Sequence, residues 1–267
     1  MTQPVSAESR QANHSSYWPS RYLRSTGLWR SPFMVKDEQR ALEQAVTWSE
    51  RLDSHKDLVC EADRVDNLLI VTKGWAYRYT CARNGGRQLT ALLVPGDIVN
   101  LDTLLFERPA YSVRTLTDVT VVALPRRRAL ALVDDYPGIA RTFTGLTILE
   151  NAIASKWMLS LGRRSARARV AHLLCELVVR LGEDDGNDVT IPFPLRQEQI
   201  GDALGLTTVH VNRMIRQLRT EGLIAICDRL LSIPDISALR HVGGFDPAYL
   251  HMRQHIDAVS SPTGDVA

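Results

Sequence analysis

The segment 197–216 constrains the fold of this chain most, because its glycines and apolar residues fit two short helices joined by a sharp turn. Gly201 is small where two steeply crossing helices come closest. Gly205 stands where the turn needs a positive φ, which costs glycine little. Thr207 follows the turn and is a good N-cap for the second helix. The apolar residues expected to form the shared core are Ile200, Leu204, Val211 and Ile215. The segment therefore predicts a helix-turn-helix.

The second helix of this pair, expected over residues 208–220, has a polar face without an acidic residue until Glu221. A recognition helix places its first turns in the major groove of DNA, where Asn and Arg read base edges and Arg also binds phosphates. The residues predicted to contact DNA are Arg196, Gln197, Thr207, Thr208, Val209, His210, Asn212, Arg213 and Arg216. A plain helical hairpin is the alternative, but the glycines, the apolar spacing and the acid-free face together favour DNA binding.

Two short apolar runs, at 223–226 and 230–233, follow the recognition helix and flank Cys227, Asp228 and Arg229. They predict a hairpin, which makes the module a winged helix whose wing touches backbone phosphates. Oxidation of an exposed Cys227 in this wing is a hypothetical means of control.

Composition limits the class of protein. A chain of 267 residues is long enough for two domains. Because its net charge is only +2, any DNA contact must come from local clusters of basic residues.

The four cysteines, Cys60, Cys81, Cys175 and Cys227, are scattered without CxxC spacing. We therefore expect buried free thiols and no metal or iron–sulfur site. No cofactor is expected. The lack of a signal sequence and of a long apolar run predicts a cytoplasmic protein with no membrane contact.

The first half of the chain predicts a β-rich domain. Trp75, Tyr77 and Tyr79 alternate with smaller or polar residues, which is the period of a strand with one buried face, and Asn84-Gly85-Gly86 indicates a hairpin. A short helix is expected before these strands, capped by Asp37, with an apolar stripe of Leu42, Ala45, Val46 and Trp48. The fold class is therefore α+β, with a loose N-terminal arm at 1–31 and a β-roll or jelly roll at 32–136.

A long apolar stripe begins after Pro137, with residues spaced three or four apart. Its members are Ile139, Phe143, Leu146, Leu149, Ile153 and Trp157. We predict a dimerisation helix and hinge over 137–162, ended by Gly162; the alternative is a helix that packs on its own domain. A winged helix-turn-helix over 163–234 and a C-terminal tail over 235–267 complete the expected order.

The whole arrangement, over roughly residues 33–233, resembles the Crp/Fnr family of bacterial transcription regulators. The motifs that carry the resemblance are Pro95-Gly96-Asp97-Ile98-Val99, Gln199-Ile200-Gly201, Asn212-Arg213 and Glu221-Gly222-Leu223-Ile224. The resemblance implies a sensor β-roll, a homodimer on a two-fold symmetric DNA operator, and contact with RNA polymerase if the protein is an activator.

The chain departs from the members of this family that bind cyclic AMP. Their ribose-binding Gly-Glu pair is replaced by Asn100-Leu101, and their phosphate-binding Arg-Ser pair by Pro109-Ala110. The resemblance places an effector pocket at Gly96, Asp97, Asn100, Leu101, Arg108, Pro109 and Ala110, although Arg108 as a substitute anion ligand is disfavoured. We expect no gating by cyclic AMP. Either an unknown effector gates the dimer, or the dimer is active as made.

Two further departures concern sensing and DNA reading. The chain has no cysteine before Cys60, unlike the oxygen sensors of the family, and His14 or His55 as a haem ligand is disfavoured. Val209 stands where many members carry a Glu that reads cytosine, so we expect contact with a thymine methyl and a different half-site. The rival functions are an enzyme, for which no catalytic motif is present, and a β-roll scaffold that binds a small molecule but not specific DNA.

Overall fold

The computed structural model describes Leu23, Leu28 and residues 31–182 and 186–251. Most of the predicted arm at 1–31, His14, and the predicted tail from residue 252 onward lie outside the described residues. Leu23 and Leu28 are buried in the core of the N-terminal domain. The expectation of a loose arm up to residue 31 is therefore wrong at these two positions, where burial removes leucine side chains from water.

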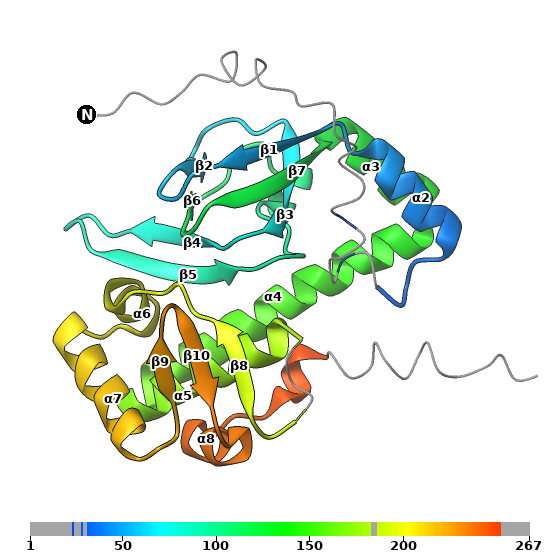
Figure 1. The fold of residues 1–267 in the computed structure, drawn as a ribbon. Helices are drawn as coiled ribbons and strands as arrows, with labels where there is room; N and C mark the ends of the chain where they lie inside the picture. The colour runs from blue at the N-terminus through cyan, green and yellow to red at the C-terminus, as the bar shows by residue number, and fades with distance from the viewer. Residues whose placement is uncertain (1–22, 24–27, 29–30, 183–185, 252–267) are drawn as a thin grey trace, which may run out of the picture.

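Two antiparallel sheets form the N-terminal domain, which is the predicted β-roll (Figure 1). The strands are β1 (Trp48–Leu52), β2 (Asp57–Val59), β3 (Asn67–Lys73), β4 (Ala76–Cys81), β5 (Arg87–Leu93), β6 (Ser112–Thr115) and β7 (Val119–Pro125). One sheet has the order β1-β7-β3 and the other β2-β6-β4-β5. Val71, Val113 and Val121, from both sheets, lie in one core.

The predicted hairpin at residues 84–86 joins β4 to β5. Gly85 has φ +84°, a value that favours glycine, and the backbone N–H of Gly86 donates to Asn84 Oδ1 at 3.0 Å. This local geometry places Arg87 and Gln88 at the start of β5, facing the second domain.

The first helix, α2 (Lys36–Ala45), begins at Lys36, so Asp37 lies in its first turn and is not the N-cap. Val35 is the N-cap, and its backbone N–H donates to Glu38 Oε2 at 2.9 Å. Glu38 Oε1 also accepts a 2.7 Å hydrogen bond from Gly138 N. This carboxylate therefore binds backbone N–H groups at the N-terminal ends of two helices, α2 and the helix that begins at Pro137. Trp48 belongs to β1 and not to the predicted helical stripe.

The predicted long helix is α4 (Pro137–Arg163), which follows α3 (Arg126–Asp135). It continues through Gly162, so the expectation that this glycine breaks it is wrong. The helix ends when Arg164, the C-cap, donates from its backbone N–H to Ser160 O at 3.2 Å. Ser165 then caps α5 (Ala166–Arg180) by accepting from Ala168 N. The hinge between the two helices is therefore Arg164 and Ser165.

The apolar stripe of α4 packs on its own chain, which corrects the prediction of an intersubunit stripe. Phe143 is buried in the N-terminal core, and Ile153 and Trp157 are buried in the core that contains the C-terminal domain. Leu146 and Leu149 are partly buried against the same two cores. Periodicity reports that a face is buried, but it does not report which chain covers it. A different face of α4 is exposed and consists of Thr144, Ile148, Asn151, Ser155, Met158 and Gly162.

The C-terminal domain contains the predicted winged helix. Its elements are β8 (Val189–Pro192), α6 (Gln197–Leu204), α7 (Thr208–Thr220), β9 (Ala225–Cys227) and β10 (Leu230–Ile233). The chain then continues as α8 (Ile236–Gly243) and η3 (Pro247–Leu250), where a tail was expected. Ile236, Leu239, Phe245 and Leu250 are all buried in the domain core, so the folded domain reaches at least to Leu250.

Candidate nucleic-acid interface

The turn between α6 and α7 has the geometry that the two glycines predict. A Cβ on Gly201 would lie 2.5 Å from Leu206 O, so only glycine permits this approach without a shift of backbone. Gly205 ends α6 with φ +62°. Thr207 caps α7, because its Oγ1 accepts from His210 N at 3.3 Å.

One side of α7 is buried in the domain and the other is open to solvent. Val211, Met214 and Leu218 form the buried side, whereas the predicted core residue Ile215 is only partly buried. In Figure 1, α7 lies at the edge of the C-terminal domain that faces away from the β-roll. The recognition helix is therefore accessible along its polar face.

The polar face of α7 brings most of the predicted DNA-contacting residues together. Val209 is 79% exposed, the highest value among the large exposed apolar side chains. Arg213 Nη2 lies 2.9 Å from His210 Nε2, and Arg216 Nη2 donates to Asn212 Oδ1 at 3.5 Å. Thr207 and Thr208 are exposed at the start of the helix. Arg196 is the exposed N-cap of α6 and Gln197 its first residue.

Three acidic residues next to α7 in the fold, two on α6 and one at the C-cap of α7, are paired with arginines from other elements. Arg87 of β5 binds both Glu198 and Asp202 of α6. Arg167 of α5 pairs with Glu221, which lowers the pKa of that carboxyl group. As a result, no carboxylate in the described part of the chain forms an ion pair with the arginines of α7.

The wing is the hairpin of β9 and β10, which forms a three-stranded sheet with β8. Its tip, Asp228 and Arg229, has positive φ angles of 48° and 62°. Cys227 is exposed, with Sγ 3.5 Å from Asp228 Oδ2, and its redox role stays a prediction. Cys175 is buried, Cys60 is partly buried and Cys81 is exposed, so the expectation of buried thiols is wrong for Cys81.

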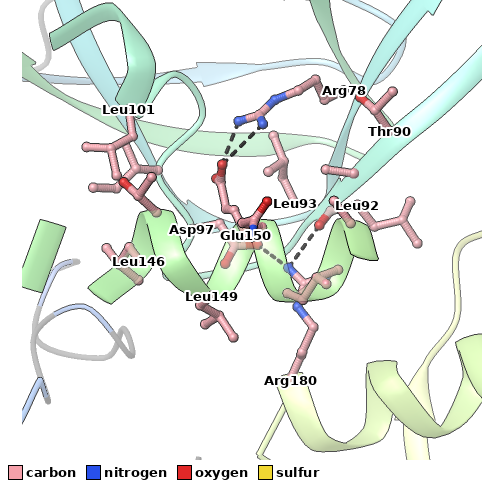
Figure 2. A pocket seen from close by; sticks show the side chains of 16 residues that line it. Arg78, Thr90, Leu92, Leu93, Asp97, Leu101, Leu146, Leu149, Glu150 and Arg180 are labelled. Carbon is pink, nitrogen blue, oxygen red and sulfur yellow. Dashed lines mark hydrogen bonds and ion pairs between the residues drawn. The ribbon is translucent and has the colours of Figure 1, made fainter. Parts of the chain in front are cut away.

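A pocket of about 370 Å³ lies between β5, the segment that follows it, and α4 (Figure 2). Of the residues predicted for an effector pocket, Asp97 and Leu101 line it. Asn100 does not, because it is fully buried and its Oδ1 accepts from Leu69 N at 2.9 Å. Asn100 Nδ2 donates to Asn67 O at 3.0 Å. The other predicted residues, Gly96, Arg108, Pro109 and Ala110, are also outside the lining.

Two pocket residues that the sequence reasoning missed are Arg78 and Glu150. Arg78 Nη1 lies 3.3 Å from Glu150 Oε2, and Arg78 Nη2 donates to Val99 O at 2.9 Å (Figure 2). Burial opposes the charge on Arg78, but Glu150 and Tyr111 outweigh it, so the pKa of the guanidinium is raised. Glu150 is the only acidic residue between positions 137 and 163, which is the signal that could have identified it.

The described part of the chain contains no cluster of three His, Cys, Asp or Glu side chains arranged to hold a metal ion. No helix in that part is long and apolar enough to cross a bilayer.

Comparison with known proteins agrees with this architecture. Residues 49–136 match the model of the cyclic nucleotide-binding domain, and residues 168–242 match that of the Crp-like helix-turn-helix domain. The solved structure of FixK2 from Bradyrhizobium japonicum has a TM-score of 0.68 at 24% identity and covers 75% of this chain and 98% of its own. A CooA mutant from Carboxydothermus hydrogenoformans has a TM-score of 0.62 at 16% identity and covers 87% of this chain and 99% of its own.

Curated relatives identify the same class. The chain is 30% identical over 182 residues to the nitrogen fixation regulation protein FixK of Bradyrhizobium diazoefficiens, covering 68% of this chain and 76% of the relative. It is 28% identical over 216 residues to the transcriptional activator protein FnrL of Cereibacter sphaeroides, covering 79% and 86%. The fold and the exposed recognition helix define a DNA-binding transcription regulator. The chain belongs to the Crp/Fnr family.

Proposed function

We propose that this regulator binds a palindromic operator as a homodimer, with one α7 helix in the major groove of each half-site. The exposed face of α7 carries the proposal, because its arginines have no carboxylate partner among the described residues. Family members act as dimers, and a two-fold dimer of helix-turn-helix modules binds half-sites about 34 Å apart.

Within each half-site, Val209, His210, Asn212 and Arg213 are assigned to base edges. Val209 projects from the first turn of α7, where a short apolar side chain fits a thymine methyl group. Arg213 fits a guanine edge, which presents two acceptors to a guanidinium. The residues assigned to the phosphate backbone are Arg196, Gln197, Thr207, Thr208 and Arg216.

The dimer contact is assigned to the exposed face of α4 and not to the stripe around Phe143 and Trp157. Positions 144, 148, 151, 155, 158 and 162 alternate steps of four and three, which is the spacing of a coiled-coil seam. Ile148 is 59% exposed and Met158 is 64% exposed in the single chain. A second copy of α4 would remove both side chains from water.

The dimer is proposed to bind DNA without a cyclic nucleotide. Arg78, a cation in the pocket, is already neutralised by Glu150 of α4, and Asn100 is turned into the core. The β-roll is thus tied to α4 by side chains of the chain itself. Gating by an effector other than a cyclic nucleotide is the second candidate, which the pocket itself favours.

Activation is the proposed outcome of DNA binding, with RNA polymerase as the partner, because the relative FnrL is named as a transcriptional activator. Because the proposed target is chromosomal DNA, we assign the protein to the cytoplasm. Neither an enzymatic activity nor a scaffold without specific DNA binding is part of this proposal.

The test is DNA selection by the purified protein from a random pool, without ligand and at near-physiological salt. A palindrome with half-site centres about one helical turn apart is expected. Enrichment of no motif, with only salt-sensitive binding, would contradict ligand-free activity. Absence of any salt-dependent binding would favour the scaffold. A double variant, R213A/R216A, is the control and should enrich nothing.

A further inference from the structure

The first helix of the helix-turn-helix, α6, is held against the β-roll of its own chain. Arg87 at the start of β5 donates from Nε to Asp202 Oδ2 at 2.7 Å and from Nη2 to Glu198 Oε1 at 2.8 Å. Its side chain is only 22% exposed, and its guanidinium carbon lies 5.6 Å from the ring centre of Tyr77. Gln88 adds a 3.2 Å hydrogen bond from Nε2 to Ala203 O.

Such a link is stronger than an ordinary surface ion pair. One guanidinium serves two carboxylates on successive turns, and it lies against an aromatic ring that shields it from water. Without Arg87, Glu198 and Asp202 would stand four residues apart as like charges on one helix face. The helix is thus drawn to the β-roll at this point.

A second arginine holds the C-terminal end of α6 from another side of the domain. Arg169 of α5 donates from Nη1 to Leu204 O, the last residue of α6, at 3.0 Å. The same side chain donates from Nη2 to Leu161 O, near the end of α4, at 2.8 Å. It therefore fastens α6 to the dimerisation helix across the two-residue hinge.

A third link joins α5 to the β-roll. Arg180, whose side chain is 10% exposed, donates to Leu92 O at 2.9 Å and to Asp97 Oδ2 at 2.6 Å (Figure 2). Between these links, Leu89 and Leu92 of β5 share one apolar core with the C-terminal domain. Figure 1 shows α6 directly beside β5, with α7 on its outer side.

These contacts point to Arg87 as a positioning residue for DNA recognition. We propose that Arg87, by fastening α6 to the β-roll, sets the angle of the recognition helix relative to the dimerisation helix without a ligand. The reason is geometric: α6 and α7 share a core, so the placement of α6 determines the placement of α7. In the dimer, this angle determines the separation of the two recognition helices. The inference rests on the proposed homodimer.

The experiment measures spacing preference, which a general loss of stability would not change selectively. A series of palindromes is made from the selected half-site, in which the spacer between the two halves is shortened or lengthened by one or two base pairs. Each base pair changes the separation of the half-sites by about 3.4 Å along the DNA axis. The dissociation constant for each is measured by fluorescence anisotropy with the wild type and with R87A. Arg83→Ala, an exposed arginine on the same hairpin, is the matched control.

The wild type and R83A should strongly prefer one spacing. In R87A, the ratio of the dissociation constants for the disfavoured and favoured spacings should fall about tenfold, which is the order expected for the loss of charge-assisted hydrogen bonds. Its affinity for a single half-site should stay within twofold of the wild type. The charge-exchanged protein R87E/D202R should regain the preference. If R87A does not fold, R87Q serves instead, because its amide side chain keeps the aliphatic stem against Tyr77.

Folded, dimeric Arg87 variants that keep the wild-type spacing preference would overturn the proposal and leave the dimer intact. A wild type that selects no palindrome would instead contradict the homodimer, and the positioning role of Arg87 with it.

Discussion

His172 on α5 is a buried, uncharged histidine, and its replacement by phenylalanine should make the fold less sensitive to acid. The residue is 2% exposed, and its ring centre lies 5.0 Å from that of Phe245 and 6.2 Å from that of Tyr249. Burial, assisted by the nearby charges of Arg164 and Lys156, lowers the pKa of His172 to about 4. A phenylalanine ring is also flat and aromatic, although it is larger than imidazole, and it cannot be protonated.

The sign of the effect follows from where protons bind. An unfolded histidine has a pKa of about 6.5, so between that value and about pH 4 the unfolded chain binds a proton that the native chain does not. The free energy of unfolding therefore falls as the pH falls through this window. A gap of about 2.5 pH units corresponds to roughly 3 kcal/mol by pH 4.

The assay is urea unfolding of the wild type and H172F at steps between pH 7.5 and pH 4. Burial raises the pKa of Glu176, which acts in the opposite direction, but this carboxyl group is present in both proteins and largely cancels in the difference. The advantage of H172F over the wild type should grow by roughly 3 kcal/mol from pH 7.5 to pH 4. His241→Gln, at an exposed position, is the matched histidine control. Parallel curves for H172F and wild type would refute the reasoning.

Three further predictions concern the dimer and the DNA. Ile148→Asp should give a folded monomer in sedimentation equilibrium, because a charge on the exposed face of α4 opposes pairing. Ile153→Asp should instead lower the unfolding temperature, because it places a charge in the chain's own core. Arg213→Ala should cost about 1–3 kcal/mol on the selected operator in anisotropy titrations, whereas Arg216→Ala should weaken all sequences alike and reduce the salt slope by about one. Val209→Glu should change the selected base at one position of each half-site, and an unchanged motif would contradict direct reading by Val209.

The helix-turn-helix was predictable because its geometry is local. The clash at Gly201 involves Leu206 and the left-handed turn involves Gly205 alone, so a short segment contains all the partners that matter. The same holds for the hairpin at Asn84, where the turn residues bond to one another. Local signals do not always suffice. The sequence analysis expected a tail where α8 lies, although Asp235 caps this helix and Gly244 ends it.

The exposed face of α4, to which we assign the dimer contact, was not predictable from periodicity. Phe143 and Trp157 follow a strong apolar stripe, but that stripe is used twice within one chain, first by the β-roll and then by the C-terminal domain. The exposed face contains Thr144, Asn151 and Ser155, and its small polar residues weaken the apolar signal. The most apolar side of α4 is buried within its own chain, so the less apolar side is the one that stays available for the proposed partner.

The positive surface of the recognition helix also depends on long-range pairing that the sequence does not display. A net charge of +2 describes the whole chain, but it does not reveal that Glu198 and Asp202 on α6 and Glu221 at the C-cap of α7 are paired with arginines. Arg87 and Arg167 pair with these three carboxylates from 54 or more positions away in the chain, and no local pattern brings such partners together. The pairs that fasten α6 to the β-roll thus also offset the charge of two carboxylates on the helix that precedes α7. Because an Arg87 variant leaves Glu198 and Asp202 without this arginine, the single half-site affinity, expected to stay within twofold, must be measured beside the spacing preference.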